Sequence, residues 1–177
     1  MTDRLPAEQE ALYQQAISEF GAALERLTRA YEADREKRRD LLQDIHVALW
    51  RSLQSFNGRC SLRTWVYRVA HNVATSQVIR RRARAPAWVS LEELESVADS
   101  YDGERALDRR LALERLLALI RTLDPLDRRV ILLYLEEIDA ASIGEITGLS
   151  AGNVAVKIHR IKQVLSRRFD QGVTDGK

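Results

Sequence analysis

The 177-residue sequence has few of the residues that build disulfides, metal centres and catalytic sites. Its single cysteine, Cys60, excludes an intramolecular disulfide and a multi-cysteine zinc site, which fits a reducing compartment such as the cytoplasm. Its three histidines, His46, His71 and His159, lie on separate predicted helices without a cysteine or carboxylate cluster at metal-ligand spacing. No glycine-rich phosphate loop is present either. We therefore expect no metal, no other cofactor and no enzymatic activity.

Long apolar runs are also lacking. No stretch of the sequence approaches the length that spans a membrane. The N-terminal segment, MTDRLPAEQEALYQQ, contains acidic residues and has no apolar core of signal-peptide length. We expect a cytoplasmic protein that does not insert into membranes.

Charge of neither sign dominates, because 28 lysines and arginines nearly balance 26 aspartates and glutamates. The resulting net charge of +2 says little about partners, but the charges are unevenly distributed. Basic residues concentrate at 80–84 and 157–168, whereas acidic residues concentrate at 92–104. Two basic surfaces separated by an acidic connector are typical of contact with a polyanion at two places.

Hydrophobic spacing predicts an all-α fold, with two small helical domains joined by an acidic linker. The N-terminal domain, residues 1–85, is predicted to be a bundle of three helices. The first spans about 12–31 and the second about 40–56, before the turn signal Asn57-Gly58. The third starts at Ser61 as N-cap and is predicted to bury its apolar residues, namely Leu62, Trp65, Val66, Val69, Ala70 and Val73.

Residues 86–103 are predicted to be the linker, because Pro86 interrupts the helical pattern and the residues that follow are acidic and weakly apolar. Trp88, Val89 and Leu91 are candidates for docking this linker onto one of the domains, since a wholly disordered tether rarely contains a tryptophan.

The C-terminal domain, residues 104–177, is predicted to end in a helix-turn-helix. Its first helix begins at about Glu104 and carries an apolar stripe that includes Leu111, and its last helix runs to about Phe169. Capping or terminating residues mark the other boundaries: Asp124-Pro125 before the second helix, Asp139 before the third, Gly148 after it, and Ser150 before the last.

The last helix carries polar groups suited to a DNA groove, opposite an apolar face. Asn153 could pair with adenine, and Val156 could contact a thymine methyl group. Lys157 and Arg160 could reach guanine or phosphates. The alternative is a tight helical hairpin with basic solubilising residues, but the glycine turn and the two caps favour DNA binding.

The segment from Trp65 to Arg84 combines aromatic and amide side chains with an arginine-rich end. The rings of Trp65 and Tyr67 offer stacking surfaces to unpaired bases, and Asn72 can hydrogen-bond a base edge. The arginines can neutralise phosphates. The apolar neighbours of Trp65 favour a place in the bundle core, so Asn72 and the arginines are the stronger candidates. The alternative is an amphipathic helix with a solvated basic end.

Three motifs together resemble the extracytoplasmic-function sigma factors, the minimal two-domain branch of the sigma-70 family of bacterial RNA polymerase sigma factors. The motifs are DLLQDIHVALW at 40–50, FNGRCSLRTWVYRVAHN at 56–72 and LDPLDRRVILLYLEEIDAASIGEITGLSAGNVAVKIHRIKQVL at 123–165. The resemblance covers nearly the whole chain. It implies a region 2 domain that binds core RNA polymerase and the unpaired minus-10 element, and a region 4 domain that reads the duplex minus-35 element.

The resemblance also implies partners and site residues. The partners are core RNA polymerase, through its beta-prime and beta subunits, promoter DNA and an anti-sigma factor. The core-binding candidates are Asp40, Gln43, Asp44 and Trp50. The minus-10 candidates are Asn57, Arg59, Ser61, Trp65, Arg68, Asn72, Arg80 and Arg81, and the minus-35 candidates are Asn153, Val156, Lys157 and Arg160.

Some positions depart from the pattern of the family. His46 stands where relatives mostly carry a large apolar residue, and Asn153 replaces a common threonine. Gly144 occupies a place where alanine is typical, and a glycine inside a helix costs about 1 kcal/mol relative to alanine. We expect Gly144 to allow a closer approach of the two helices of the helix-turn-helix.

Other functions remain open at this point. The main alternative is a helix-turn-helix regulator that binds DNA without polymerase, with residues 1–85 as a sensor or dimerisation domain. An adaptor for another sigma factor would not need the basic last helix, and a DNA-modifying enzyme is the weakest of the alternatives. The motifs at 40–72 favour the sigma factor, because a sensor domain has no need of them. Whether Cys60 has a redox role is left open.

Overall fold

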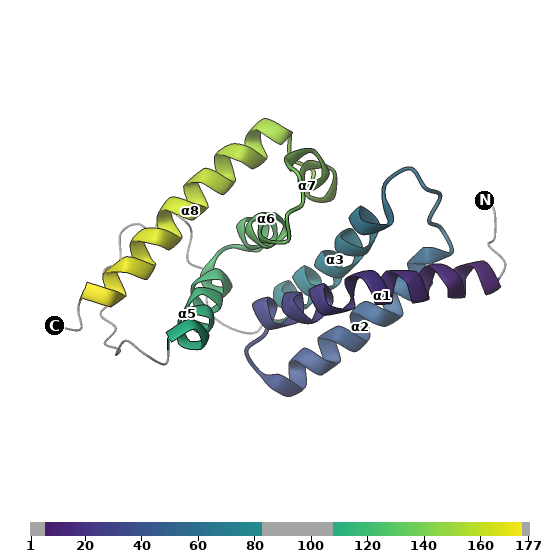
Figure 1. Cartoon of the computed structure of the whole chain (residues 1–177), viewed down its shortest axis with the longest axis horizontal. Helices are drawn as coiled ribbons and strands as arrows, with labels where there is room; N and C mark the ends of the chain where they lie inside the picture. Colours follow the sequence, from purple (N-terminus) through teal and green to yellow (C-terminus); the bar gives the residue numbers. More distant parts are fainter. Residues whose placement is uncertain (1–5, 83–107, 175–177) are drawn as a thin grey trace. The chain divides into compact units, whose positions relative to one another are not determined.

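The computed structural model describes residues 6–82 and 108–174, with the side chains of residues 7–81 and 110–169. In these ranges the regular structure consists of seven helices and contains no strand, which confirms the all-α fold class (Figure 1). The chain divides into two units, Met1–Ala85 and Pro86–Lys177. The predicted linker at 86–103 and the predicted helix start at Glu104 lie outside the described residues.

Three helices of the N-terminal unit pack on one another: α1 (Pro6–Tyr31), α2 (Arg35–Leu53) and α3 (Leu62–Arg82) (Figure 1). Each contributes an apolar face to a common core whose fully buried members include Leu24, Ile45 and Ala70. The second helix begins before the predicted Asp40, because the Asp34 carboxylate caps it. That carboxylate accepts the backbone N–H groups of Glu36 at 2.9 Å and Lys37 at 3.0 Å.

The loop between α2 and α3 follows the sequence signals. Gly58 has a φ of +74°, the left-handed conformation that glycine adopts without steric cost. The Ser61 hydroxyl accepts the N–H of Thr64 at 3.0 Å, so Ser61 is the predicted N-cap of α3. Within α3, Val66 and Ala70 are fully buried, whereas Leu62, Trp65, Val69 and Val73 are only partly buried.

The C-terminal unit contains α5 (Asp108–Thr122), α6 (Pro125–Leu135), α7 (Ala140–Thr147) and α8 (Ala151–Thr174). Its helix boundaries confirm the predictions made from the capping residues. The carboxylates of Asp124 and Asp139 accept N–H groups at the starts of α6 and α7, and Gly148 ends α7 with a φ of +81°. Ser150 caps α8 through the N–H of Asn153 at 3.2 Å. The last helix extends beyond the predicted end at Phe169.

The core of this unit lies between α6, α7 and α8, where Val130, Ile143 and Ile161 are fully buried. The predicted burial of Leu111 on α5 is wrong, because 53% of this residue is exposed. It lies one turn before Arg115, whose guanidinium stacks on the ring of Phe169 at 5.3 Å where α5 meets α8. None of the helices within the described ranges combines the length and the apolar character needed to cross a membrane.

Candidate nucleic-acid interface

The helix α8 has one buried face and one exposed face. Val154 and Ile161 are fully buried against the rest of the unit. On the other side Asn153, Val156 and Arg160 are exposed, and Val156 is 69% exposed although its side chain is apolar. This exposed face presents an amide, a methyl surface and a guanidinium, which are the groups that read base edges in a major groove.

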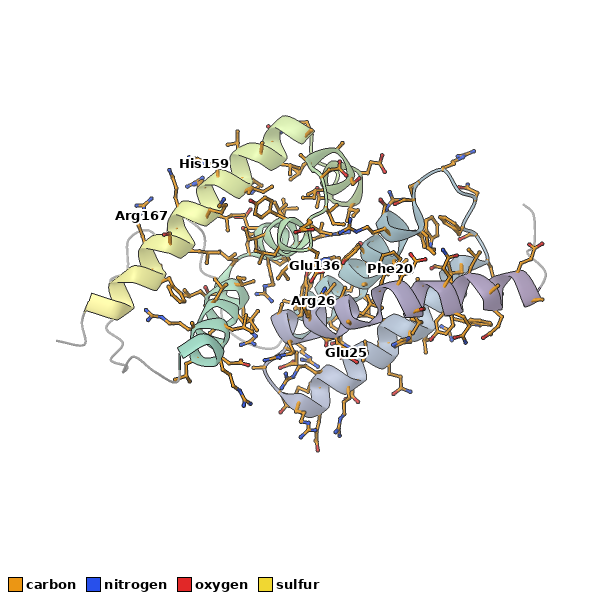
Figure 2. The ribbon with its side chains drawn as sticks, viewed as in Figure 1. Phe20, Glu25, Arg26, Glu136, His159 and Arg167 are labelled. Carbon is orange, nitrogen blue, oxygen red and sulfur yellow. The ribbon has the colours of Figure 1, made fainter. Side chains whose placement is uncertain are left out.

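Two further residues on this exposed face were not singled out from the sequence. Figure 2 shows that His159 and Arg167 project from α8 on the side away from α6. Both are exposed, and the side-chain amide of Gln163 lies 3.0 Å from Nε2 of His159. Their helical spacing from Val156 and Arg160 was the signal that could have identified them.

The turn before α8 brings the backbone of Leu149 close to Gly144 of α7. A Cβ added to Gly144 would lie 2.6 Å from the carbonyl oxygen of Leu149, which is backbone and cannot move aside alone. The backbone that comes close to Gly144 therefore belongs to the turn that joins α7 to α8. The expected close approach of the two helix axes is not what this glycine accommodates. Since Gly148 ends α7 in the left-handed conformation, both glycines fix how α8 leaves the turn.

Lys157 is only partly on the exposed face of α8. Its ammonium group lies 2.5 Å from Oδ1 of Asp127 near the start of α6, and 34% of the lysine side chain but only 4% of the aspartate side chain is exposed. Burial and the neighbouring Asp124 raise the pKa of the Asp127 carboxyl, while the Lys157 ammonium acts in the opposite direction. The structure thus gives this predicted DNA contact a carboxylate partner within the protein.

The next residue along α6, Arg128, is also buried, with 3% exposed. Its guanidinium donates to the carbonyl oxygens of Arg121 and of Leu123, the latter at 3.1 Å. The first turn of α6 is therefore connected to α5 by the hydrogen bond of Arg128 and to α8 by the ion pair of Asp127. Neither contact could be predicted from local sequence, because each partner lies outside the helix that carries the charged residue.

The predicted minus-10 residues of α3 divide into exposed and buried groups. Asn72 and Arg80 are exposed, Arg68 is half-buried, and Tyr67 is only 2% exposed. The prediction that Tyr67 offers a stacking surface is wrong, because its ring lies in the core beside Phe20, at 6.3 Å between ring centroids. Its position on the same helix face as Ala70 and Ala74 explains the burial.

Trp65 lies in the first turn of α3 and contacts residues at the end of α2 and just after it. Its ring contacts that of Phe56 edge to face at 5.4 Å, and its Nε1 donates to the Ser52 hydroxyl at 3.0 Å. The residue is half-buried, so it is less enclosed than the core position that its apolar neighbours in the sequence favoured. In the loop, Asn57 and Arg59 are exposed, and the exposed Ser61 uses its hydroxyl as the helix cap.

Arg81, near the end of α3, forms an ion pair with Glu32 at the end of α1. The two side chains are 45% and 16% exposed, so this pair is at the surface. The pair connects the basic end of α3 to the start of the segment that joins α1 to α2. Such a pair was not visible in the sequence, because 49 positions separate its members.

The predicted polymerase-binding residues lie along α2. Asp40, Gln43 and Asp44 are exposed, and Asp44 accepts a hydrogen bond from the Gln77 amide at 2.8 Å. Trp50 is half-buried and contacts the Tyr13 ring edge to face at 5.4 Å. Val47, 42% exposed, is an apolar residue at helical spacing from Gln43 and Asp44 that the sequence argument did not include.

His46 of α2 packs inward toward α1. Its Nδ1 lies 2.8 Å from the Tyr13 hydroxyl, and partial burial lowers the pKa of its imidazole. His46 replaces a large apolar residue at this position, and its polar imidazole is accommodated by the hydrogen bond to Tyr13. In the described ranges, no three histidine, cysteine or acidic side chains gather as a metal ion would require.

Comparisons with known proteins match both units. The family model for sigma-70 region 2 matches residues 16–85, and the model for sigma-70 region 4 matches residues 113–165. The RNA polymerase sigma factor YlaC of Bacillus subtilis is 30% identical over 163 residues, which are 90% of this chain and 91% of YlaC. The chain belongs to the sigma-70 family of RNA polymerase sigma factors.

Other similarities agree with this family. The RNA polymerase sigma factor CnrH of Cupriavidus metallidurans is 29% identical over 183 residues, covering 95% of this chain and 94% of CnrH. The fold is similar to that of the sigma factor RpoE of Bartonella quintana, solved in complex with the anti-sigma factor NepR. That similarity has a TM-score of 0.67 at 17% identity, over 89% of this chain and 96% of RpoE.

This sigma factor is of the extracytoplasmic-function type, the name carried by further relatives such as the sigma-E factor of Escherichia coli. It is a transcription initiation factor that directs RNA polymerase to promoters. The region 2 match excludes the view of residues 1–85 as an unrelated sensor domain. Asn153, Val156 and Arg160 of α8 lie within the region 4 match, and α2, α3 and their loop lie within the region 2 match.

Proposed function

We propose that the two units divide promoter recognition between a duplex-reading helix and a strand-capturing surface. The helix α8 reads the minus-35 duplex with Asn153, Val156 and Arg160. The observation that carries this proposal is the difference between the two sides of α8. Val154 is fully buried on one side, and Val156 is 69% exposed on the other. The exposed methyl groups of Val156 are suited to contact a thymine methyl group.

In the N-terminal unit, α3 and the loop before it capture the unpaired minus-10 strand. Extruding a base costs a few kcal/mol of stacking and pairing, so a pocket and a charged track are needed to recover that energy. The loop residues Asn57 and Arg59 are exposed, follow Phe56 of the Trp65–Phe56 ring pair in the sequence, and are suited to hold such a base. Asn72 and Arg80, exposed along α3, are suited to follow the strand, with Arg68 beside them.

The exposed side of α2 is the docking surface for core RNA polymerase. Asp40, Gln43 and Asp44 supply polar groups, and Val47 adds an apolar contact in the middle of that surface. Trp50 supports this surface from the side through its contact with Tyr13. Interfaces with apolar centres and polar rims are typical of specific protein association.

Three further expectations follow from membership in this family. The polymerase partners are the beta-prime and beta subunits of the core enzyme, and the site of action is the cytoplasm, where transcription takes place. An anti-sigma factor is the third expected partner, and RpoE of Bartonella quintana was solved with one. A protein that co-purifies with this chain from its own cells should then inhibit promoter-specific transcription in a reconstituted system.

The test is to reconstitute the full chain with core polymerase and to sequence the transcripts from genomic templates. Promoter-specific transcripts are expected, and failure to form a stable complex with core at low salt would refute the proposal.

The division of labour is tested with the pair of substitutions Arg80→Ala and Arg81→Ala. Open-complex formation should weaken more than core binding, whereas the control Arg26→Ala, at an exposed position on α1 outside both proposed surfaces, should spare open-complex formation. Equal loss of core binding and promoter opening in the double variant would contradict the assignment of α3 to DNA.

A further inference from the structure

We propose that Asp127 is a positioning residue for duplex binding, because it withholds the Lys157 ammonium group from the DNA. The sequence places Lys157 among the duplex-contacting residues of α8, but the structure assigns its charge to the interior of the unit. This inference rests on the proposed function, in which the exposed face of α8 meets the duplex.

The geometry supports a stable internal pair. The Lys157 Nζ lies 2.5 Å from Oδ1 of Asp127, between positions 30 residues apart. The two members of the pair differ in solvent contact, since 34% of the lysine side chain but only 4% of the aspartate side chain is exposed. In the paired state water therefore reaches the lysine but hardly reaches the carboxylate, which depends on the lysine ammonium for its solvation.

This asymmetry decides between the two possible partners of Lys157. Moving its ammonium to a phosphate would leave the Asp127 carboxylate buried without its cation, beside the second carboxylate of Asp124. A phosphate at the groove edge is solvated and returns less than the buried pair loses. The lysine therefore stays with Asp127 when the duplex is bound.

Lys157 is nevertheless near enough to the duplex-facing side for its release to matter. Asn153 and Arg160 lie one turn before and after it, and both are exposed. If Asp127 lost its charge, the flexible lysine side chain could turn outward and reach a phosphate. Release would thus add one cation to the surface that meets the DNA backbone.

The test measures how the affinity of the full chain for a random-sequence duplex depends on salt. Each phosphate contact steepens the slope of log K against log salt by about 0.9. Asp127→Asn should steepen the slope by that amount, so that its affinity falls about threefold further than wild type for a fourfold rise in salt. Lys157→Gln, which keeps a hydrogen bond to Asp127, should leave the slope unchanged.

The double variant with Asp127→Asn and Lys157→Gln should return to the wild-type slope. Its neutral amide pair preserves the shape of the site, so the comparison with Asp127→Asn remains decisive if Lys157→Gln alone fails to fold. A flatter slope for Lys157→Gln would show that the lysine contacts DNA, and equal slopes for Asp127→Asn and the double variant would show no release. Either result overturns the inference.

Arg160→Gln separates this inference from the proposed function. It should flatten the slope by about 0.9, because the exposed face of α8 meets the duplex. If Arg160→Gln has no effect, the proposed function of α8 fails. If Arg160→Gln flattens the slope but Asp127→Asn does not steepen it, only the role of Asp127 fails.

Discussion

The two helices that we propose to contact DNA, α3 and α8, each carry a basic side chain paired with a carboxylate, but the two pairs differ in burial. The Arg81–Glu32 pair is at the surface, with side chains 45% and 16% exposed. In the Lys157–Asp127 pair the carboxylate side chain is only 4% exposed. Surface pairs are worth about 0–1 kcal/mol, whereas breaking a buried pair costs about 3–5 kcal/mol. The difference teaches that Arg81 can be released to DNA cheaply and Lys157 cannot.

The two helices also differ in how their first residues are held. The loop before α3 is exposed at Asn57, Gly58 and Arg59, and a Cβ on Gly58 would meet nothing within 4 Å. The turn before α8 is closed over Gly144 by the Leu149 carbonyl. A duplex is a rigid target that suits a fixed helix, whereas an unpaired strand suits a surface with an open loop.

The largest expected effect comes from Lys157→Met, which leaves the Asp127 carboxylate buried without its cation. The free energy of unfolding should fall by about 3 kcal/mol in urea denaturation. Combining Lys157→Met with Asp127→Leu should recover most of this loss, because no buried charge remains. As a control, Lys162→Met removes an exposed lysine that stacks on the Tyr134 ring at 5.3 Å, and it should cost less than about 1 kcal/mol. If both substitutions lower the free energy of unfolding by similar amounts, the buried pair of Lys157 is worth no more than the surface contact of Lys162.

The second effect concerns the turn that fixes α8. Gly144→Ala should lower the free energy of unfolding by about 1–3 kcal/mol, because the new Cβ would meet the Leu149 carbonyl oxygen at 2.6 Å. Helix propensity alone predicts the opposite sign, a gain of about 1 kcal/mol. Gly152→Ala is the matched control, since a Cβ there meets nothing within 4 Å, and it should be neutral or stabilising. Stabilisation by Gly144→Ala would show that the turn is not closely packed.

The third effect is a pH dependence that arises from Asp127, the buried member of its pair with Lys157. Burial raises the pKa of folded Asp127 above its ordinary value of 3.8, so the folded protein binds this proton more tightly than the unfolded chain does. That contribution to stability is complete below pH 3.8 and is lost as the pH rises through the raised pKa. Wild type should therefore lose stability relative to Asp127→Asn as the pH rises through this range, measured by urea denaturation at several pH values. If the free energy of unfolding of the wild type instead rises relative to that of Asp127→Asn, attraction to Lys157 outweighs burial.

The smallest effect is expected at the surface pair. Glu32→Gln should change the free energy of unfolding by less than about 0.5 kcal/mol, because both partners of the pair remain solvated. It should leave the affinity for a single-stranded minus-10 oligonucleotide unchanged or slightly higher, measured with the reconstituted holoenzyme. A loss of stability as large as that of Lys157→Met would mean that the end of α3 is fixed as firmly as α8.

Features set by neighbouring residues were predictable from the sequence, and features set by distant residues were not. The caps at Asp124, Asp139 and Ser150 and the left-handed Gly148 were predicted, because each acts on backbone groups within one turn. The exposed positions of Asn153, Val156 and Arg160 followed from helical spacing. The burial of Tyr67 and the exposure of Leu111 were not predicted, because periodicity locates a face and not the helix that covers it.

The sequence by itself determined the all-α fold, most of the helix boundaries and the family, since capping, periodicity and motifs are local patterns. Only the tertiary structure decided which of the basic residues on α3 and α8 is tied to a buried carboxylate. That decision depends on burial, because a carboxylate removed from water holds its cation far more firmly than one at the surface. The sequence presents Lys157 as a basic residue of the DNA-facing helix, and only the 4% exposure of the Asp127 side chain shows that its charge is held within the protein.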